Sequence, residues 1–275
     1  MNLNQLKELA ARLEKVLHLS SPAIGIEFSR TNESNLDPYP ASMPEESSDG
    51  RTGKVSAGCV FWMKATAASF TTDPSDHRNC SVGSLTHGIV NFDEVASNDD
   101  ISELLSSGWV TAEMVPLIPV ISERPMSINY GPLHEASFLP DVVLIRINGR
   151  QLMVLNDAVA DLQIEGKPQC HIVAMAKEYG KVAASVGCAL SRSRTGMSVN
   201  EMTCAIPIDR LETVVEELES TSKVDSGVAK YAAQDARRFL YLLRWPEYIR
   251  SKFLVVKAHS SGQCPPHTQA RAARN

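Results

Sequence analysis

One short apolar segment constrains the fold more than any other part of the sequence. Residues 142–147 read Val-Val-Leu-Ile-Arg-Ile, an almost continuous apolar run that is typical of a strand covered on both faces. Asn148-Gly149 then turns the chain into a helix that we expect over 150–163. A strand that is covered on both faces requires helices on each side of its sheet. We therefore predict an α+β (mixed α/β) fold, a single domain with a central mixed sheet flanked by helices.

Other segments supply the remaining elements. Residues 3–18 carry Leu and Val at three- and four-residue spacing, which predicts an amphipathic helix, and a short strand is expected over 23–28. The same reasoning predicts further helices over 57–70, 101–107, 209–220 and most of 228–254, and further strands over 170–174 and 202–207. The proline-rich residues 109–140 are expected to connect them with short extended pieces.

Two polar segments set the expected domain limits. Residues 30–56 contain almost no apolar side chains and are expected to form an exposed insertion. The last twenty residues, 256–275, are rich in Ser, Pro, Ala and Arg and are expected to be a disordered tail. Residues 1–255 are therefore predicted to form one α/β domain that carries the insertion.

Charge and hydropathy exclude several classes of protein. The net charge is -5 and the aromatic residues do not alternate with Lys or Arg, so we expect no nucleic-acid partner. No run of eighteen apolar residues predicts a membrane span, and the first twenty residues lack the apolar core of a secretory signal. We expect a cytoplasmic protein. The amphipathic helices near both ends are able to pair subunits, which leaves a homo-oligomer open.

Three of the six cysteines have an unusual local context. Without an export signal, the cysteines are expected to be thiols. Cys59 follows a glycine at an expected helix start, where the thiol pKa is lowered, Cys80 precedes a flexible small-residue stretch, and Cys188 follows Gly187. The chain has no C-x-x-C pair, so the local motifs of zinc knuckles and ferredoxins are absent from the sequence. The three cysteines are therefore a metal or iron–sulfur site, redox thiols without metal, or buried structural residues.

Two histidines and two arginines lie near these cysteines in sequence. His77 is spaced to share one ion with Cys80, and His77 or His87 is able to donate a proton beside the site. The alternative for each histidine is a surface or hydrogen-bonded position. Arg192 and Arg194 are able to hold an anionic substrate or to offset thiolate charge, or they lie in a solvated loop. The sequence contains no dinucleotide, P-loop, zincin or serine-hydrolase motif.

Short motifs in a fixed order add a resemblance to a known family. The chain resembles the uncharacterised bacterial and archaeal ArCR family, a domain of unknown function, in Ser21–Ile26, Cys59, Asn79–Gly83, Ser185–Cys188, Arg194–Gly196, Asn200–Met202 and Ile206-Pro207. The resemblance covers about residues 20–220. It implies a single cytoplasmic α/β domain in which three cysteines recur, matched here by Cys59, Cys80 and Cys188. It does not extend to the other three cysteines, which are expected to be structural or incidental: Cys170, Cys204 and Cys264.

The three-cysteine set leads to a specific functional hypothesis. If Cys59, Cys80 and Cys188 hold a [4Fe–4S] cluster, one iron lacks a protein thiolate and can bind substrate as a Lewis acid. The expected function is an iron–sulfur-dependent lyase or oxidoreductase that removes a leaving group from a small organic molecule by elimination or reduction. That substrate is anionic if the two arginines bind it. The alternative is a zinc-binding or redox-thiol domain that acts as a binding or sensor protein without catalysis.

Overall fold

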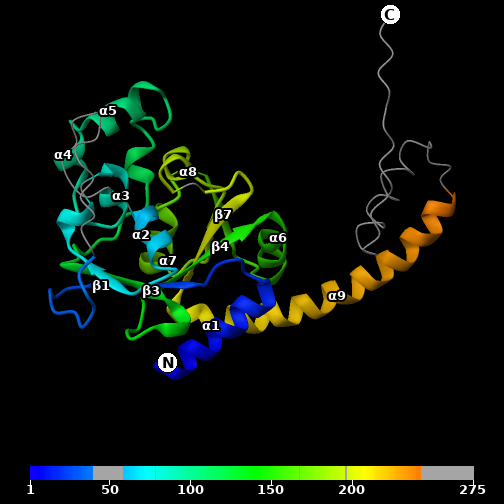
Figure 1. The fold of residues 1–275 in the computed structure, drawn as a ribbon. Helices are drawn as coiled ribbons and strands as arrows, with labels where there is room; N and C mark the ends of the chain where they lie inside the picture. The colour runs from blue at the N-terminus through cyan, green and yellow to red at the C-terminus, as the bar shows by residue number, and fades with distance from the viewer. Residues whose placement is uncertain (40–57, 78, 167, 196, 243–275) are drawn as a thin grey trace, which may run out of the picture. The chain divides into compact units, whose positions relative to one another are not determined.

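A computed structural model describes residues 1–39, 58–77, 79–166, 168–195 and 197–242 of the chain (Figure 1). The chain divides into two compact units, Met1–Ser222 and Lys223–Asn275. The first unit contains the sheet and every candidate site residue. The boundary falls inside helix α9 (Leu211–Leu242). The predicted insertion at 30–56 lies outside the described residues from 40 onward, and the predicted tail at 256–275 lies outside them entirely.

The first unit is built on a seven-stranded sheet with the strand order β2-β3-β1-β4-β7-β6-β5. β5 and β6 pair in parallel, and the other neighbouring strands pair antiparallel, so the sheet is mixed. This confirms the predicted α+β class. The strands are β1 (Ile24–Ser29), β2 (Phe70–Thr72), β3 (Ser127–Pro132), β4 (Val142–Asn148), β5 (Gln163–Glu165), β6 (Ala183–Ser185) and β7 (Glu201–Pro207).

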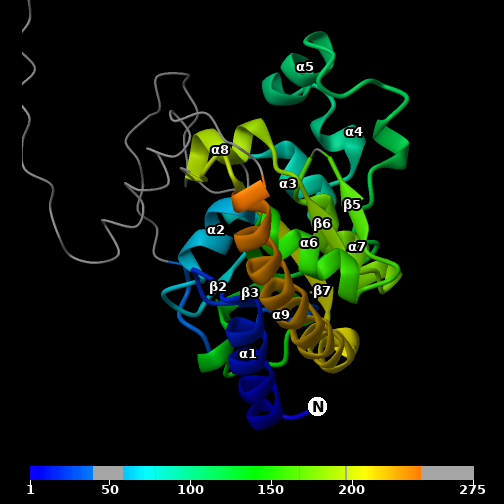
Figure 2. The same ribbon diagram turned by 90° about the vertical axis from the view of Figure 1, so that its right-hand side faces the viewer.

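Helices cover both faces of the sheet (Figures 1 and 2). Those before α9 are α1 (Leu3–Leu17), α2 (Gly58–Lys64), α3 (Ser81–Thr86), α4 (Phe92–Val95), α5 (Asp99–Ser106), α6 (Gly149–Ala158), α7 (His171–Tyr179) and α8 (Ala189–Thr195). Short 3-10 turns lie at Pro74–His77, Val115–Leu117, Leu133–Glu135 and Ile208–Arg210. In the part of the chain that the structure describes, no helix is long and apolar enough to cross a membrane.

The alternating side chains of β4 show how the two faces are filled. Val143 and Ile145 are buried in one cluster with α1, α6 and the first turns of α9. Val142 and Leu144 are buried in another cluster with α2 and α7. The strand therefore has apolar residues on both faces because each face is covered, as the sequence predicted. The cluster on the α2 and α7 face adjoins the candidate site.

Several predicted elements differ from the structure: the helix predicted over 150–163 ends at Ala158, before strand β5, and those predicted over 209–220 and 228–254 are one helix, α9, within the described residues. Two further differences lie on the face of the candidate site. The helix predicted over 57–70 ends at Lys64, and Phe70–Thr72 forms strand β2, where β-branched side chains pair with β3. The strand predicted over 170–174 is wrong, because His171–Tyr179 forms helix α7 and ends at Gly180 in the left-handed conformation. This second difference matters because it places Cys170 at the start of a helix.

Candidate metal centre

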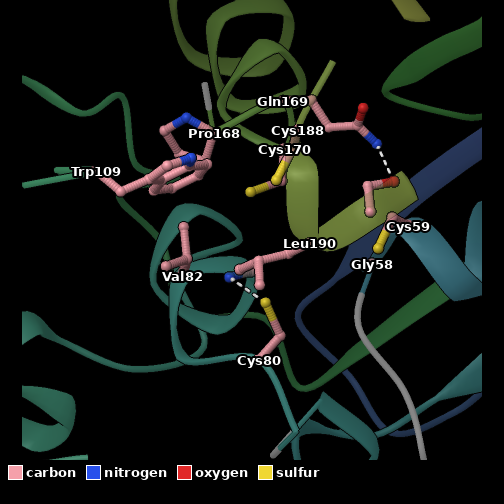
Figure 3. A pocket seen from close by; sticks show the side chains of 12 residues that line it. Gly58, Cys59, Cys80, Val82, Trp109, Pro168, Gln169, Cys170, Cys188 and Leu190 are labelled. Atoms are coloured by element: carbon pink, nitrogen blue, oxygen red, sulfur yellow. Dashed lines mark hydrogen bonds between the residues drawn. The ribbon is translucent and has the colours of Figure 1, made fainter. Parts of the chain in front are cut away.

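Four cysteines from four separate segments line one cavity (Figure 3). Three of them are the predicted set, and the fourth is Cys170. The cavity is small and partly open to solvent. The side chains around it are otherwise mostly apolar. The lining residues are Gly58, Cys59, Cys80, Val82, Gly83, Trp109, Pro168, Gln169, Cys170, Cys188, Leu190 and Ser191.

Each cysteine stands at the start of a helix. Cys59 is the second residue of α2, Cys80 is the N-cap of α3, and Cys170 is the N-cap of α7. Cys188 directly precedes α8. Helix starts leave backbone N–H groups without helical partners, and such groups are able to donate to sulfur. One does so here, since the Gly83 N–H donates to Cys80 Sγ at 3.3 Å.

Buried contacts hold these helix starts in place. Asp100 on α5 accepts hydrogen bonds from the Ser81 backbone N–H at 2.9 Å and from its hydroxyl at 2.7 Å, which fixes the first turn of α3. Gln169 donates through Nε2 to Ser191 Oγ at 2.7 Å and so joins the starts of α7 and α8. α2 packs against α8, and α3 packs against α7. The cavity therefore lies among four helix starts that are joined in pairs, α2 with α8, α8 with α7 and α7 with α3.

The other three cysteines affect the protonation of Cys170. Burial, followed by the charge of Cys80 and then of Cys188 and Cys59, raises the pKa of Cys170 well above the ordinary thiol value. The Thr86 side chain acts in the opposite direction. Cys170 therefore keeps its proton unless a cation compensates the charge of its thiolate.

The four sulfurs do not form a compact site for one ion. Among the described residues, no group of three or more His, Cys, Asp or Glu side chains is placed to hold a single metal ion. A tetrahedral zinc site needs sulfurs about 3.8 Å apart, because each Zn–S bond is about 2.3 Å long.

Arg192 supports the cysteine loop instead of facing the cavity. Its guanidinium donates to the carbonyl oxygens of Val186 and Glu201, at 3.0 Å each, and to that of Ser198. Gly187 lies beneath it with φ +114°, and a Cβ there would come within 2.7 Å of Arg192 Nη2. The arginine thus clamps the turn that carries Cys188. The backbone of Arg194 lies in α8, and its side chain is outside the described part of the chain.

His77 and His87 are buried behind α2, and neither is among the described residues that line the cavity. His87 Nδ1 bonds to the Gly83 carbonyl oxygen at 2.8 Å, which leaves Nε2 as the acceptor nitrogen. His77 Nε2 pairs with Thr72 Oγ1 at 3.0 Å. His77 Nδ1 and His87 Nε2 find no hydrogen-bond partner among the described residues. The structure therefore does not bring His77 and Cys80 to a common ion position.

Burial keeps both imidazoles neutral. It lowers the pKa of His87 to about 4, although the bond to Gly83 opposes this shift. Burial and the neighbouring His87 lower the pKa of His77 well below its usual value. The two ring centroids are 6.2 Å apart. His87 also packs directly beneath Gly58, the residue before Cys59, where a Cβ would lie 2.9 Å from His87 Cε1.

Comparison with known proteins places the chain in a family. The sequence profile described as uncharacterised ArCR matches residues 12–217. The chain belongs to the uncharacterised ArCR family. No curated protein and no solved structure matches it. All four cavity cysteines lie within the ArCR match, as does Cys204, which is fully buried in the cluster on the opposite face of the sheet.

Three of the residues that line the four-cysteine cavity were not identified from the sequence. Cys170 was expected to be incidental, whereas it lines the cavity with the predicted three. Its signal was Pro168, which is typical of the residues just before a helix and marks Cys170 as a helix start. Trp109 and Gln169 also line the cavity. They come from an irregular segment and a helix start, and no motif singles them out.

Proposed function

We propose that this ArCR protein is a cytoplasmic enzyme that binds a [4Fe–4S] cluster through Cys59, Cys80 and Cys188. One observation carries the proposal. Three cysteines that are far apart in sequence, and that share a glycine or turn context, line a single cavity. Thiolates are the usual protein ligands of iron–sulfur clusters.

The lack of a single-ion donor group among the described residues favours a cluster over a single ion. The described residues offer no three donors arranged around one ion. A four-iron cluster carries its thiolates on different iron atoms and therefore accepts sulfurs that are further apart. The donor set thus fits a cluster.

The lining residues suit chemistry on a small organic molecule. When bound, such a cluster supplies electrons and, at an iron without a protein thiolate, a Lewis-acidic position for elimination or reductive removal of a leaving group. Val82, Trp109, Pro168 and Leu190 surround the thiols with apolar surface, which excludes water. The Gly83 N–H bond to Cys80 stabilises a thiolate at that position.

The polar residues near the site have different places in this proposal. Arg192 keeps Cys188 in position through three carbonyl contacts, so it is a positioning residue. An anionic substrate would therefore depend on Arg194. Neither histidine lines the cavity, and His87, which packs against Gly58 beside Cys59, would act as a proton donor only after a movement at the start of α2. His77 lies behind it, bonded to Thr72.

A second function is a zinc or redox-thiol domain without catalysis. It is favoured by the number of thiols, because four cysteines are a common ligand set of structural zinc. This alternative requires the four helix starts to move together around one ion.

Metal analysis of anaerobically purified protein separates these proposals. If the cluster is present, the protein should be brown, contain about four iron atoms per chain and absorb at about 400 nm. Cys188→Ser should lose most of the iron, whereas Cys204→Ser, a buried cysteine on the other face, should keep it. One zinc per chain and no iron would support the alternative. Equal iron in both variants would refute the three-thiolate site.

A further inference from the structure

The proposed site uses three cysteines and assigns no role to a fourth, Cys170. It lines the same cavity as Cys59, Cys80 and Cys188 (Figure 3). It also packs against the small apolar cluster that includes Cys80, together with Cys59. Each of the other three thiols acts electrostatically on it. Cavity lining, packing and charge therefore agree that Cys170 is a member of the group.

The helix that carries Cys170 is fixed on the sheet. Ile172 and Val173, the second and third residues of α7, are fully buried. α7 contacts β4, β6 and β7 as well as α3. These contacts hold α7 from both sides and so fix the backbone position of Cys170 at the cavity.

A purely structural reading explains this position poorly. An incidental buried cysteine is expected in an apolar run, as Cys204 is in β7, where it lies among apolar side chains of the opposite cluster. Cys170 instead occupies a helix start that shares a cavity with three other helix starts, each carrying a cysteine.

We propose that Cys170 is the fourth thiolate ligand of the cluster in the resting protein. This inference rests on the proposed function and changes one part of it. All four irons would then have a protein ligand, one from each helix start around the cavity. The position expected to be open would be closed until the Cys170 ligand is replaced. A resting cluster of this kind should not bind small iron ligands from solution.

The test uses full-length Cys170→Ala and Cys170→Ser proteins, with Cys204→Ala as the matched control for loss of a buried cysteine. Cyanide is the probe of an open iron position, and the readouts are iron content and the electron paramagnetic resonance spectrum of the reduced protein. Wild type and Cys204→Ala should show the same spectrum with and without cyanide. Cys170→Ala should show a changed spectrum that changes again with cyanide, or should lose iron as Cys188→Ser does. Cys170→Ser should retain more iron than Cys170→Ala, because serine still offers an oxygen ligand.

The outcomes separate this inference from the function it rests on. Iron-loaded Cys170→Ala with a wild-type spectrum and no response to cyanide would overturn the fourth ligand and leave the three-thiolate cluster intact. A wild-type protein that itself binds cyanide would do the same. Wild-type protein without iron would overturn both. Circular dichroism of each variant shows whether a loss of iron follows from a loss of the fold. If Cys170→Ala does not fold, the iron content and cyanide response of Cys170→Ser decide whether Cys170 is a ligand.

Discussion

Replacing Gly58 with alanine tests whether the contact between α2 and His87 positions Cys59. A Cβ on Gly58 would lie 2.9 Å from His87 Cε1 and 3.2 Å from Nε2. Favourable contacts between carbon atoms begin at about 3.5 Å, so one partner must move by about half an ångström. Neither partner has room, because both residues are buried and His87 Nδ1 is bonded to the Gly83 carbonyl oxygen at 2.8 Å.

The expected cost follows from two opposing effects. Overpacking a buried position costs about 1–3 kcal/mol, whereas alanine is favoured over glycine in a helix by about 0.5–1 kcal/mol. We therefore expect Gly58→Ala to lower the free energy of unfolding by about 1–2 kcal/mol. The same displacement moves the start of α2, and with it Cys59, so the metal content should also fall.

Gly149→Ala is the matched control. Gly149 is the first residue of α6, as Gly58 is of α2, and a Cβ there would meet nothing within 4 Å. This variant should be as stable as wild type or slightly more stable. Urea denaturation of the three proteins gives the comparison, with metal analysis alongside. If Gly58→Ala matches Gly149→Ala in stability and keeps wild-type metal content, the packing argument is wrong.

Three further predictions concern Arg192, His87 and Cys204. In urea denaturation, Arg192→Lys should lower the free energy of unfolding by about 1–3 kcal/mol, because the guanidinium bonds to backbone carbonyl oxygens are lost. Arg210→Lys, which alters a partly exposed pair with Asp161, should lower it by less than about 1 kcal/mol. Equal losses in the two variants would argue against a stabilising role of Arg192 at the Cys188 turn. Burial lowers the pKa of His87 to about 4, so as the pH falls this imidazole is protonated in the unfolded chain before it is protonated in the folded protein. The free energy of unfolding should therefore fall between about pH 6.5 and pH 4, by up to about 3 kcal/mol from this group. His87→Phe should flatten unfolding free energy against pH, and an unchanged slope would contradict the assignment. Burial raises the pKa of Cys204 to about 12, so iodoacetamide at about pH 8 should label it only after unfolding, as mass spectrometry of the labelled peptide would reveal.

The parts of the fold that the sequence predicted are those with a strong local pattern. The leucine spacing of residues 3–18 predicted α1, and the apolar run of residues 142–147 predicted β4 with cover on both faces. Cys59, Cys80 and Cys188, which were grouped from their glycine and turn contexts, line one cavity in the structure.

The remaining features depend on contacts that no local pattern records. The run from Cys170 to Ala174 is short and apolar, and such a run fits a strand or a buried helix equally well. Because residues 170–174 were predicted to be a strand, Cys170 was not recognised as a residue at the start of a helix. Arg192 was recognised as a cation near Cys188, but its partners are three carbonyl oxygens from two other segments. Sequence indicates the charge of a side chain and not the atoms that will meet it.

The origin of the four helix starts has a consequence for assembly. They come from both ends of a long stretch of chain, from Cys59 to Cys188, that also includes β3, β4, β5 and β6. A bound group that joins them would cross-link the two ends of this stretch. Closing a loop of about a hundred residues lowers the entropy of the unfolded chain, which stabilises the folded protein by about 4–5 kcal/mol. The sheet must form before this cross-link can close, so loading would be a late step of folding. Its loss should loosen α2, α3 and α8 first and leave the layer of α1 and α6 in place.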